Sequence, residues 1–375
     1  MLRSMDDVHA LAEQLLPLTH RAAPGRVYRD LVQGLGEAGL IARMFPSRLG
    51  GSADTDVSAT TLCGLRETVA KVSTEMETTL AMQGLGAYPI LQSGQPRVAD
   101  DWIPRVARGD AVPAFALTEP DAGSDAAALA LAAEPDGDGW RLTGEKTWIS
   151  NAPDADVYTV FGRTGPDSGA RGVTAFCVAG DSQGLSGRPL SMISPHALGH
   201  LTFDGVRVEA DHVLGEPGGG FRVAMRTLDL FRPSVGAFAV GMAQAALDAS
   251  VAHARTREAF GQPIAGFQAV SHLLAEMATR VAAARLLVYE AARVYDEGGE
   301  DVSAAAAMAK LYATEAAQFV VDAAVQIHGA RALESGHLLE QLYREVRAPR
   351  IYEGTSEIQR TIIARQLLRP GSASG

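Results

Sequence analysis

The sequence predicts an α+β multidomain protein with three successive parts: a helical domain, a small barrel-like or sandwich-like β-domain, and a helical bundle. Apolar residues recur at helical spacing over residues 1–112. Short runs rich in β-branched and aromatic residues fill 113–215, and long Ala- and Leu-rich stretches fill 216–375. These three ranges are the expected domains, since 375 residues exceed what one simple core holds.

The first part is predicted as helices that Gly and Pro interrupt. Helical spacing is clear in LAEQLLPL, DLVQGLGEAGLIARMF and LCGLRETVAKVS. The opening MLRSMDDVHALAEQLLPL carries acidic residues among its apolar ones and lacks the basic start of a secretion signal. It therefore predicts an amphipathic helix.

The second part is predicted as strands, among them GWRLTGEKTWIS, DVYTVFGRT, GVTAFCVAG and LTFDGVRV. The Asp136-Gly137-Asp138-Gly139 cluster predicts a hairpin directly before the first of these runs.

The third part contains three long helical stretches, at 221–256, 266–298 and 303–328. Glycines at 298, 299 and 329 are expected to end helices. We expect one helix to end at Gly261 and the next to begin near Phe267. The second stretch carries one broad apolar stripe that predicts antiparallel packing, formed by Val270, Leu273, Leu274, Met277, Val281, Ala284 and Val288.

Bulk properties exclude several functions. The net charge of −11 and the pI near 5.3 argue against nucleic-acid binding, because no basic field attracts phosphate. No apolar run is expected to span a bilayer. Cys63 and Cys177 lie in no ligand-like spacing, so neither disulfides nor structural zinc are expected, and a reducing cytoplasm is the default. His196 and His200 form one HxxxH spacing, but Pro195 and Gly199 argue against a helix there, so no metal is predicted.

Two stretches of the β-domain could bind a ligand. In FALTEPDAGSD (115–125), Gly123 lets the backbone approach a ligand, and the hydroxyls of Thr118 and Ser124 can bond a heteroaromatic edge or a phosphate. An ordinary Pro/Gly/Asp loop is the alternative. In GEKTWISN, Trp148 offers a stacking face, although a buried core tryptophan is the commoner role.

The bundle carries further candidates. Asp229 and Arg232 lie on one helical face, either as a surface pair or as ligand-binding groups. Arg257 could compensate a helix dipole or hold a pyrophosphate. His328, in QIHGA, is more often a packed or capping residue than a catalyst.

Glu353 lies in RIYEGTSEIQ (350–359), between an aromatic residue and Gly354. Gly354 predicts a tight turn, Thr355 or Ser356 a helix cap, and Glu357 a first-turn carboxylate. Alone, this pattern indicates only a helix start with a solvated glutamate.

Taken together and in this order, FALTEPDAGSD, TWIS, TREAFGQPI, VQIHGA and RIYEGTSEIQR resemble the acyl-CoA dehydrogenase family over nearly the whole chain. The resemblance implies a C-terminal four-helix bundle, FAD as cofactor, an acyl thioester as substrate, an electron-transfer flavoprotein as acceptor, and a homotetramer or homodimer. It places Glu353 as the catalytic base. The implied flavin contacts are Phe115, Leu117, Thr118, Gly123, Ser124, Trp148, Ser150, Thr355 and Glu357, and the implied contacts to a neighbouring subunit's FAD are Arg257, Phe260, Gln268, Gln326 and Gly329.

By the same resemblance, Ser124, Asp229 and Arg232 match positions that touch the acyl-CoA, and Gly354 lets the backbone sit close to the thioester. A thioester α-proton is weakly acidic, so a carboxylate in a desolvated site makes a better base. Some members place the base near Asp229–Arg232 instead, but no acid there is better placed than Glu353.

The chain departs from the family pattern at Ser191–His200, at Ala330-Arg331 and at Arg344-Glu345. These departures leave the acyl group and its carrier, CoA or an acyl carrier protein, open. Two other functions stay open on the same fold: a flavin oxidase or monooxygenase, and a degenerate binding subunit.

Overall fold

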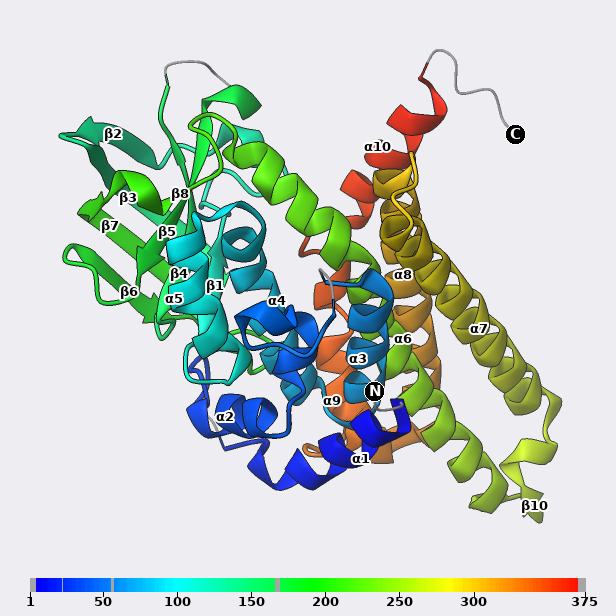
Figure 1. Ribbon diagram of the computed structural model, residues 1–375. Coiled ribbons are helices and arrows are strands. Elements are labelled where there is room, and N and C mark those ends of the chain that lie inside the picture. Colours follow the sequence, from blue (N-terminus) through cyan, green and yellow to red (C-terminus); the bar gives the residue numbers. More distant parts are fainter. Residues whose placement is uncertain (1–4, 22, 55–56, 166–168, 370–375) are drawn as a thin grey trace. The chain divides into compact units, whose positions relative to one another are not determined.

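The computed structural model describes residues 5–21, 23–54, 57–165 and 169–369. These form two compact units. The bundle unit comprises the described residues of 1–13, 58–77 and 229–375, and the sheet unit comprises those of 14–57 and 78–228. The order of helices, then strands, then helices is as predicted (Figure 1). The three boundaries inferred from the sequence stay a prediction.

The sheet unit contains eight strands in the order β6-β7-β3-β2-β4-β5-β8, with β1 parallel to β4. The predicted hairpin joins β2 to β3, with Asp136 opposite Gly139. The strands are β1 (Pro113–Ala116), β2 (Ala132–Asp136), β3 (Gly139–Ser150), β4 (Val157–Arg163), β5 (Val173–Ala179), β6 (Leu185–Pro189), β7 (Leu198–Val208) and β8 (Val213–Leu214). The helices α2 (Arg29–Glu37) and α5 (Pro96–Ala107) belong to this unit.

Strands β4 and β5 are continuous apolar runs because both of their faces are buried: six of the seven residues in each are buried. Strand β3 alternates more because only one of its faces is buried.

The bundle unit is built from long Ala-rich helices. Its elements are α3 (Ala59–Val72), most of α6 (Gly220–Thr256), β9 (Glu258–Ala259), β10 (Gln262–Pro263), α7 (Gln268–Asp296), α8 (Val302–His328), α9 (Leu338–Glu345) and α10 (Ser356–Leu367). The helices α1 (Met5–Leu15) and α4 (Thr74–Ser93) begin in this unit. In α1, Val8 and Ala12 are buried while Asp6 and Asp7 are exposed, so the predicted amphipathic helix is confirmed from Met5 on, and residues 1–4 of the predicted stretch lie outside the described residues.

Small residues let the bundle helices approach closely. A Cβ on Gly236 of α6 would lie 2.7 Å from Val288 Cγ2 of α7 and 3.4 Å from Ala313 Cβ of α8. A Cβ on Gly241 would lie 2.5 Å from the Glu67 carbonyl of α3. These contacts pack α6 against α3, α7 and α8.

Two sequence expectations need correction. Helix α6 ends at Thr256, not at Gly261, because Phe260 (φ 52°) and Gly261 (φ 81°) form the left-handed turn of the β9–β10 hairpin. The expectation of no membrane-spanning length also fails for α6, where an 18-residue window reaches a mean hydropathy of 1.4. That window is 72% buried inside the protein, which is the pattern of a core helix.

Candidate functional site

Glu353 and Gly354 form a left-handed turn directly before α10. Their φ angles are 53° and 92°, and such a conformation is uncommon for a residue with a side chain. A Cβ on Gly354 would lie 2.7 Å from Gln359 Nε2, so both this contact and the φ of 92° favour glycine there. Thr355 caps α10, its hydroxyl accepting a hydrogen bond from the Ile358 amide at 3.3 Å, as the sequence predicted.

Side chains from three helices hold this turn by its carbonyl groups. Arg232 Nε of α6 donates to the Glu353 carbonyl at 3.2 Å, and Gln359 Nε2 of α10 donates to the carbonyls of Glu353 and Gly354 at 3.1 and 3.0 Å. Lys310 Nζ of α8 donates to the Gly354 carbonyl at 2.6 Å. An uncommon backbone conformation persists where its surroundings determine it in this way.

The carboxylate of Glu353 has an unusual environment. Its side chain is half-buried, and Oε2 is shielded from solvent with no hydrogen-bond partner among the described residues. Burial raises the pKa of Glu353 above its ordinary value, while the positive charges of Arg66, Lys310 and Arg232 oppose that rise. A carboxylate held in place, desolvated and with a free oxygen can accept a proton.

Asp229 and Arg232 lie beside this turn on α6. Their side chains are 3.5 Å apart, and Ser303 Oγ donates to Asp229 Oδ2 at 2.8 Å. Arg232 is only 5% exposed, so a plain surface pair is excluded for it. Burial raises the pKa of Asp229, although the Ser303 hydrogen bond and the charge of Arg232 oppose the rise. Contact of either residue with substrate stays a prediction.

The loop after β1 is the second predicted cluster, and it lies in the sheet unit. Gly123 and Ser124 are exposed, and a Cβ on Gly123 would meet no atom within 4 Å. Leu117 is buried, while Phe115 and Thr118 are half-buried. The loop therefore presents an open backbone and an exposed hydroxyl.

Lys146 of β3 holds this loop by two hydrogen bonds. Its ammonium donates to the Leu117 carbonyl at 3.0 Å and to Glu119 Oε1 at 2.8 Å. The Glu119 carboxylate also accepts from the amides of Ala130 and Leu131, at 2.6 and 2.9 Å.

Trp148 is not a core tryptophan. The pairing of β3 with β7 shifts register between Lys146 and Ile149, and Trp148 at this bulge has a φ of 54°. Its side chain is 51% exposed. Ser150 is half-buried at the end of the same strand. The bulge turns an aromatic face outward.

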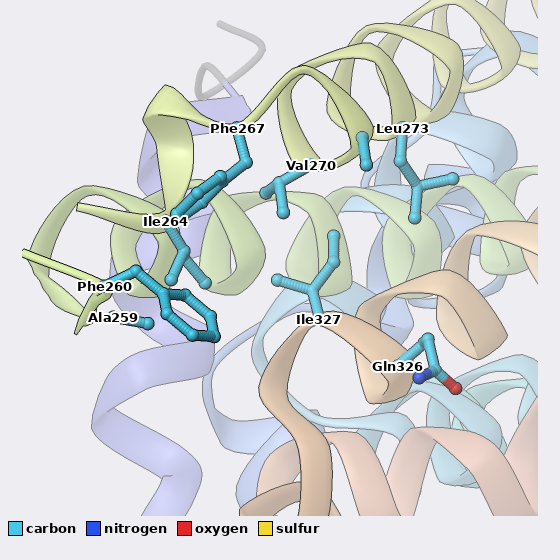
Figure 2. A pocket seen from close by; sticks show the side chains of 9 residues that line it. Ala259, Phe260, Ile264, Phe267, Val270, Leu273, Gln326 and Ile327 are labelled. Atoms are coloured by element: carbon cyan, nitrogen blue, oxygen red, sulfur yellow. The ribbon is translucent and has the colours of Figure 1, made fainter. Parts of the chain in front are cut away.

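The third predicted cluster lies in the bundle unit, near the C-terminal ends of α6 and α8 and the N-terminal end of α7. A groove of about 420 Å³ there is lined by Phe260, Gln326 and apolar side chains of the β9–α7 segment (Figure 2). Phe260 is 96% exposed, Gln268 opens α7, and Gly329 ends α8 with a φ of 64°. Arg257 and Gln268 are exposed and do not line the groove.

The residues present fit FAD. Trp148 and the open loop at Gly123 and Ser124 offer a stacking face, a close backbone approach and a hydroxyl, which a planar heteroaromatic ring requires. Phe260 and the groove beside Gln326 offer an apolar surface with a polar amide.

Sequence reasoning missed the residues that support these loops. They are Lys310 and Gln359 at the Glu353 turn, Lys146 and Glu119 at the loop after β1 (residues 115–125, the flavin-type loop), and the buried pair of Arg66 with Glu77. One signal was available: the chain has 33 lysines and arginines, and only three of them are lysines.

Comparison with known proteins identifies the family. The chain matches the N-terminal domain of acyl-CoA dehydrogenases over 4–110, the middle domain over 114–206 and the C-terminal domain over 218–368. It is 37% identical over 368 residues to the probable acyl-CoA dehydrogenase FadE25 of Mycobacterium tuberculosis, covering 96% of this chain and 94% of that protein.

Solved structures agree. Butyryl-CoA dehydrogenase of Megasphaera elsdenii has a TM-score of 0.92 at 33% identity, covering 98% of this chain and 99% of that one. A structure described as the electron transferring flavoprotein of Acidaminococcus fermentans has a TM-score of 0.92 at 35% identity, covering 98% and 97%. The prolyl acyl carrier protein oxidase AnaB has a TM-score of 0.89 at 28% identity, covering 98% and 100%.

The fold and these matches define an FAD-dependent oxidoreductase that acts on CH–CH groups. The chain belongs to the acyl-CoA dehydrogenase family.

Proposed function

We propose that the protein dehydrogenates an acyl thioester between Cα and Cβ, with Glu353 as the base. The observation that carries this proposal is the buried Oε2 of Glu353, which has no hydrogen-bond partner in the described part of the chain and lies on a turn fixed by three helices. The Cα–H bond breaks, its proton goes to the Glu353 carboxylate, and a Cα=Cβ double bond forms as the β-hydrogen leaves as hydride. Bound FAD supplies the acceptor for that hydride, since no amino-acid side chain accepts one.

The chain's own residues prepare this step in two ways. Burial raises the pKa of Glu353 and so strengthens it as a base. Gly354, which has no side chain, lets the turn pack against Gln359, Ile358 and Arg232 beside the carboxylate. We assign substrate contacts to Ser124, Asp229, Arg232 and Gly354.

We assign the cofactor contacts as the sequence predicts them. The flavin ring is held by Phe115, Leu117, Thr118, Gly123, Ser124, Trp148 and Ser150, with Thr355 and Glu357 along the cofactor. Arg257, Phe260, Gln268, Gln326 and Gly329 serve the FAD of a neighbouring copy, which requires self-association as a homotetramer or homodimer. The 96% exposure of Phe260 supports such a contact. An electron-transfer flavoprotein in the cytoplasm is the proposed acceptor.

The test is anaerobic mixing of the purified yellow protein with a panel of CoA and carrier-protein thioesters. We expect at least one saturated acyl thioester to bleach the flavin absorbance, and the matching free acid to leave it unchanged. If no thioester on either carrier bleaches it, the proposal is wrong.

A second candidate is an oxidase acting on a carrier-protein thioester, which the likeness to AnaB favours. The discriminating measurement is turnover in air. One hydrogen peroxide released per product identifies an oxidase, whereas turnover that requires an added electron acceptor identifies a dehydrogenase.

A further inference from the structure

The three lysines of this chain are placed very unequally. Lys71 forms a surface ion pair with Asp248, and its side chain is 42% exposed. Lys146 and Lys310 are both 0% exposed. Lys146 supports the flavin-type loop, and Lys310 lies under the Glu353 turn. In a chain that uses arginine at nearly every other cationic position, a buried lysine at each functional loop calls for an explanation.

Lys310 lies on an apolar face of α8, where its neighbours Ala306, Ala307, Ala309 and Ala313 are buried. Its ammonium donates to the Gly354 carbonyl at 2.6 Å, one residue from the proposed base. Burying a cation is costly unless it is paired, so this contact is maintained against a substantial desolvation penalty. A neutral amide could make the same hydrogen bond at a smaller penalty, which indicates that the charge itself has a role.

Three cations act on the Glu353 carboxylate: Arg66 of α3, Lys310 of α8 and Arg232 of α6. Arg66 of α3 bonds Glu77 of α4 and also donates to Ser234 Oγ at 2.9 Å. From α6, Arg232 contacts Asp229.

Acidic side chains on α8, α9 and α10 also lie around the turn. Glu315 of α8 bonds Arg350 and Ser356 at 2.9 and 2.7 Å, Glu345 of α9 is buried, and Glu357 of α10 is exposed. Arg66 is paired with Glu77, and Arg232, which also bonds the turn, is paired with Asp229. Lys310 forms no ion pair among the described residues, and its bond to the Gly354 carbonyl is shorter than that of Arg232 to the Glu353 carbonyl, 2.6 against 3.2 Å.

We propose that Lys310 is a positioning residue for the base: its ammonium fixes the Glu353–Gly354 turn and keeps the Glu353 carboxylate ionised. Without this cation, the Glu353–Gly354 turn is held less firmly. The Glu353 carboxylate is then protonated over a wider range of pH. This inference rests on the proposed role of Glu353.

The electrostatic directions agree with this assignment. The charge of Lys310 lowers the pKa of Glu353. Burial lowers the pKa of Lys310 to about 8, helped by Arg232 and opposed by Glu353, Glu315 and Glu357. Lys310 is therefore a cation at and below neutral pH, the range in which Glu353 must be ionised to act.

Two variants separate the hydrogen bond from the charge. In Lys310→Gln an amide can still donate to the Gly354 carbonyl without a charge, and in Lys310→Met both are lost. Lys71→Met is the matched control, because it removes a lysine from a surface pair. Each variant is assayed for FAD content, melting temperature and the pH dependence of anaerobic flavin bleaching by a thioester substrate.

We expect Lys310→Gln to keep FAD and to lose bleaching rate about tenfold more at pH 6 than at pH 8, because the acid limb moves to higher pH. Lys71→Met should follow the wild-type profile. A Lys310→Gln profile that is uniformly lowered but unchanged in shape would show a merely structural lysine, and so would failure of both Lys310 variants to fold.

A second readout needs no turnover. The carboxylic-acid C=O stretch that vanishes in Glu353→Gln reports protonation of this one group by infrared difference spectroscopy. In Lys310→Gln its titration midpoint should move to higher pH, and an unmoved midpoint contradicts the inference. One outcome separates the two proposals. If none of the thioesters bleaches the flavin of the wild-type protein but the titration midpoint of Glu353 still moves in Lys310→Gln, the proposed function fails and the electrostatic role of Lys310 stands.

Discussion

The two lysine-supported loops are built differently. Beneath the flavin-type loop, Lys146 meets the carboxylate of Glu119, which also accepts two backbone amides. At the Glu353 turn, Lys310 bonds a backbone carbonyl instead, and the nearby carboxylate keeps an oxygen without a partner among the described residues. The first arrangement satisfies its charges and holds a shape. The second leaves one acceptor unsatisfied, which is the property that a base requires.

Among the variants that test the difference between the two loops, Lys146→Met is expected to lower stability the most. The variant leaves the 6%-exposed Glu119 without its cation, and breaking a buried pair typically costs about 3–5 kcal/mol. We expect a lower free energy of unfolding in urea and a loss of bound FAD, because the loop that presents Gly123 and Ser124 loses its support. Lys71→Met is the control. A change in unfolding free energy below about 1 kcal/mol would mean that the pair does not support the loop.

An intermediate effect is expected from Gly354→Ala. The new Cβ must adopt a φ of 92° and lies 2.7 Å from Gln359 Nε2. Strain of this kind costs on the order of 1–3 kcal/mol, so bleaching should slow by roughly tenfold or more while FAD stays bound.

The matched control is Gly298→Ala, at a φ of 67° with no atom within 4 Å of the new Cβ. It has the left-handed strain without the clash, far along the chain from the turn. If both variants bleach at the wild-type rate, the turn does not require glycine.

The smallest effect is expected where charges are exposed. Arg207 of β7 pairs with Asp136 and Asp138 at the β2–β3 hairpin and with Glu209, and its side chain is 39% exposed. Water and salt screen such pairs, so Arg207→Ala should shift the melting temperature by less than about 2 °C. A larger shift would mean that the exposed pairs of Arg207 contribute to stability as the buried pair of Lys146 with Glu119 does, which contradicts this account.

Much of the fold could be predicted because its signals are local. The run GWRLTGEKTWIS matches β3 at Gly139–Ser150, and the Asp/Gly cluster before it marked the hairpin. The three long helices follow the predicted stretches to within a few residues, except at Gly261. At Gly261 the sequence pattern did not distinguish a helix end from a hairpin turn, because glycine is common both after the last residue of a helix and in the turn of a hairpin.

The supports of the site could not be predicted, since they join residues far apart in the sequence. Lys310 reaches a carbonyl 44 positions away, and Lys146 reaches a carboxylate 27 positions away. No local pattern encodes such pairs. The outward face of Trp148 also depends on a register shift against β7, which only the pairing of strands reveals.

The central claim is that Glu353 removes the α-proton, and its most direct test is the rate of anaerobic flavin bleaching in Glu353→Gln. The amide keeps the size of the side chain but accepts no proton, so FAD content and melting temperature should stay near those of the wild-type protein. With the same thioester, bleaching should slow by about 10²–10⁴-fold. A rate within a few-fold of wild type, at equal FAD content, would contradict the account and move the base to another residue.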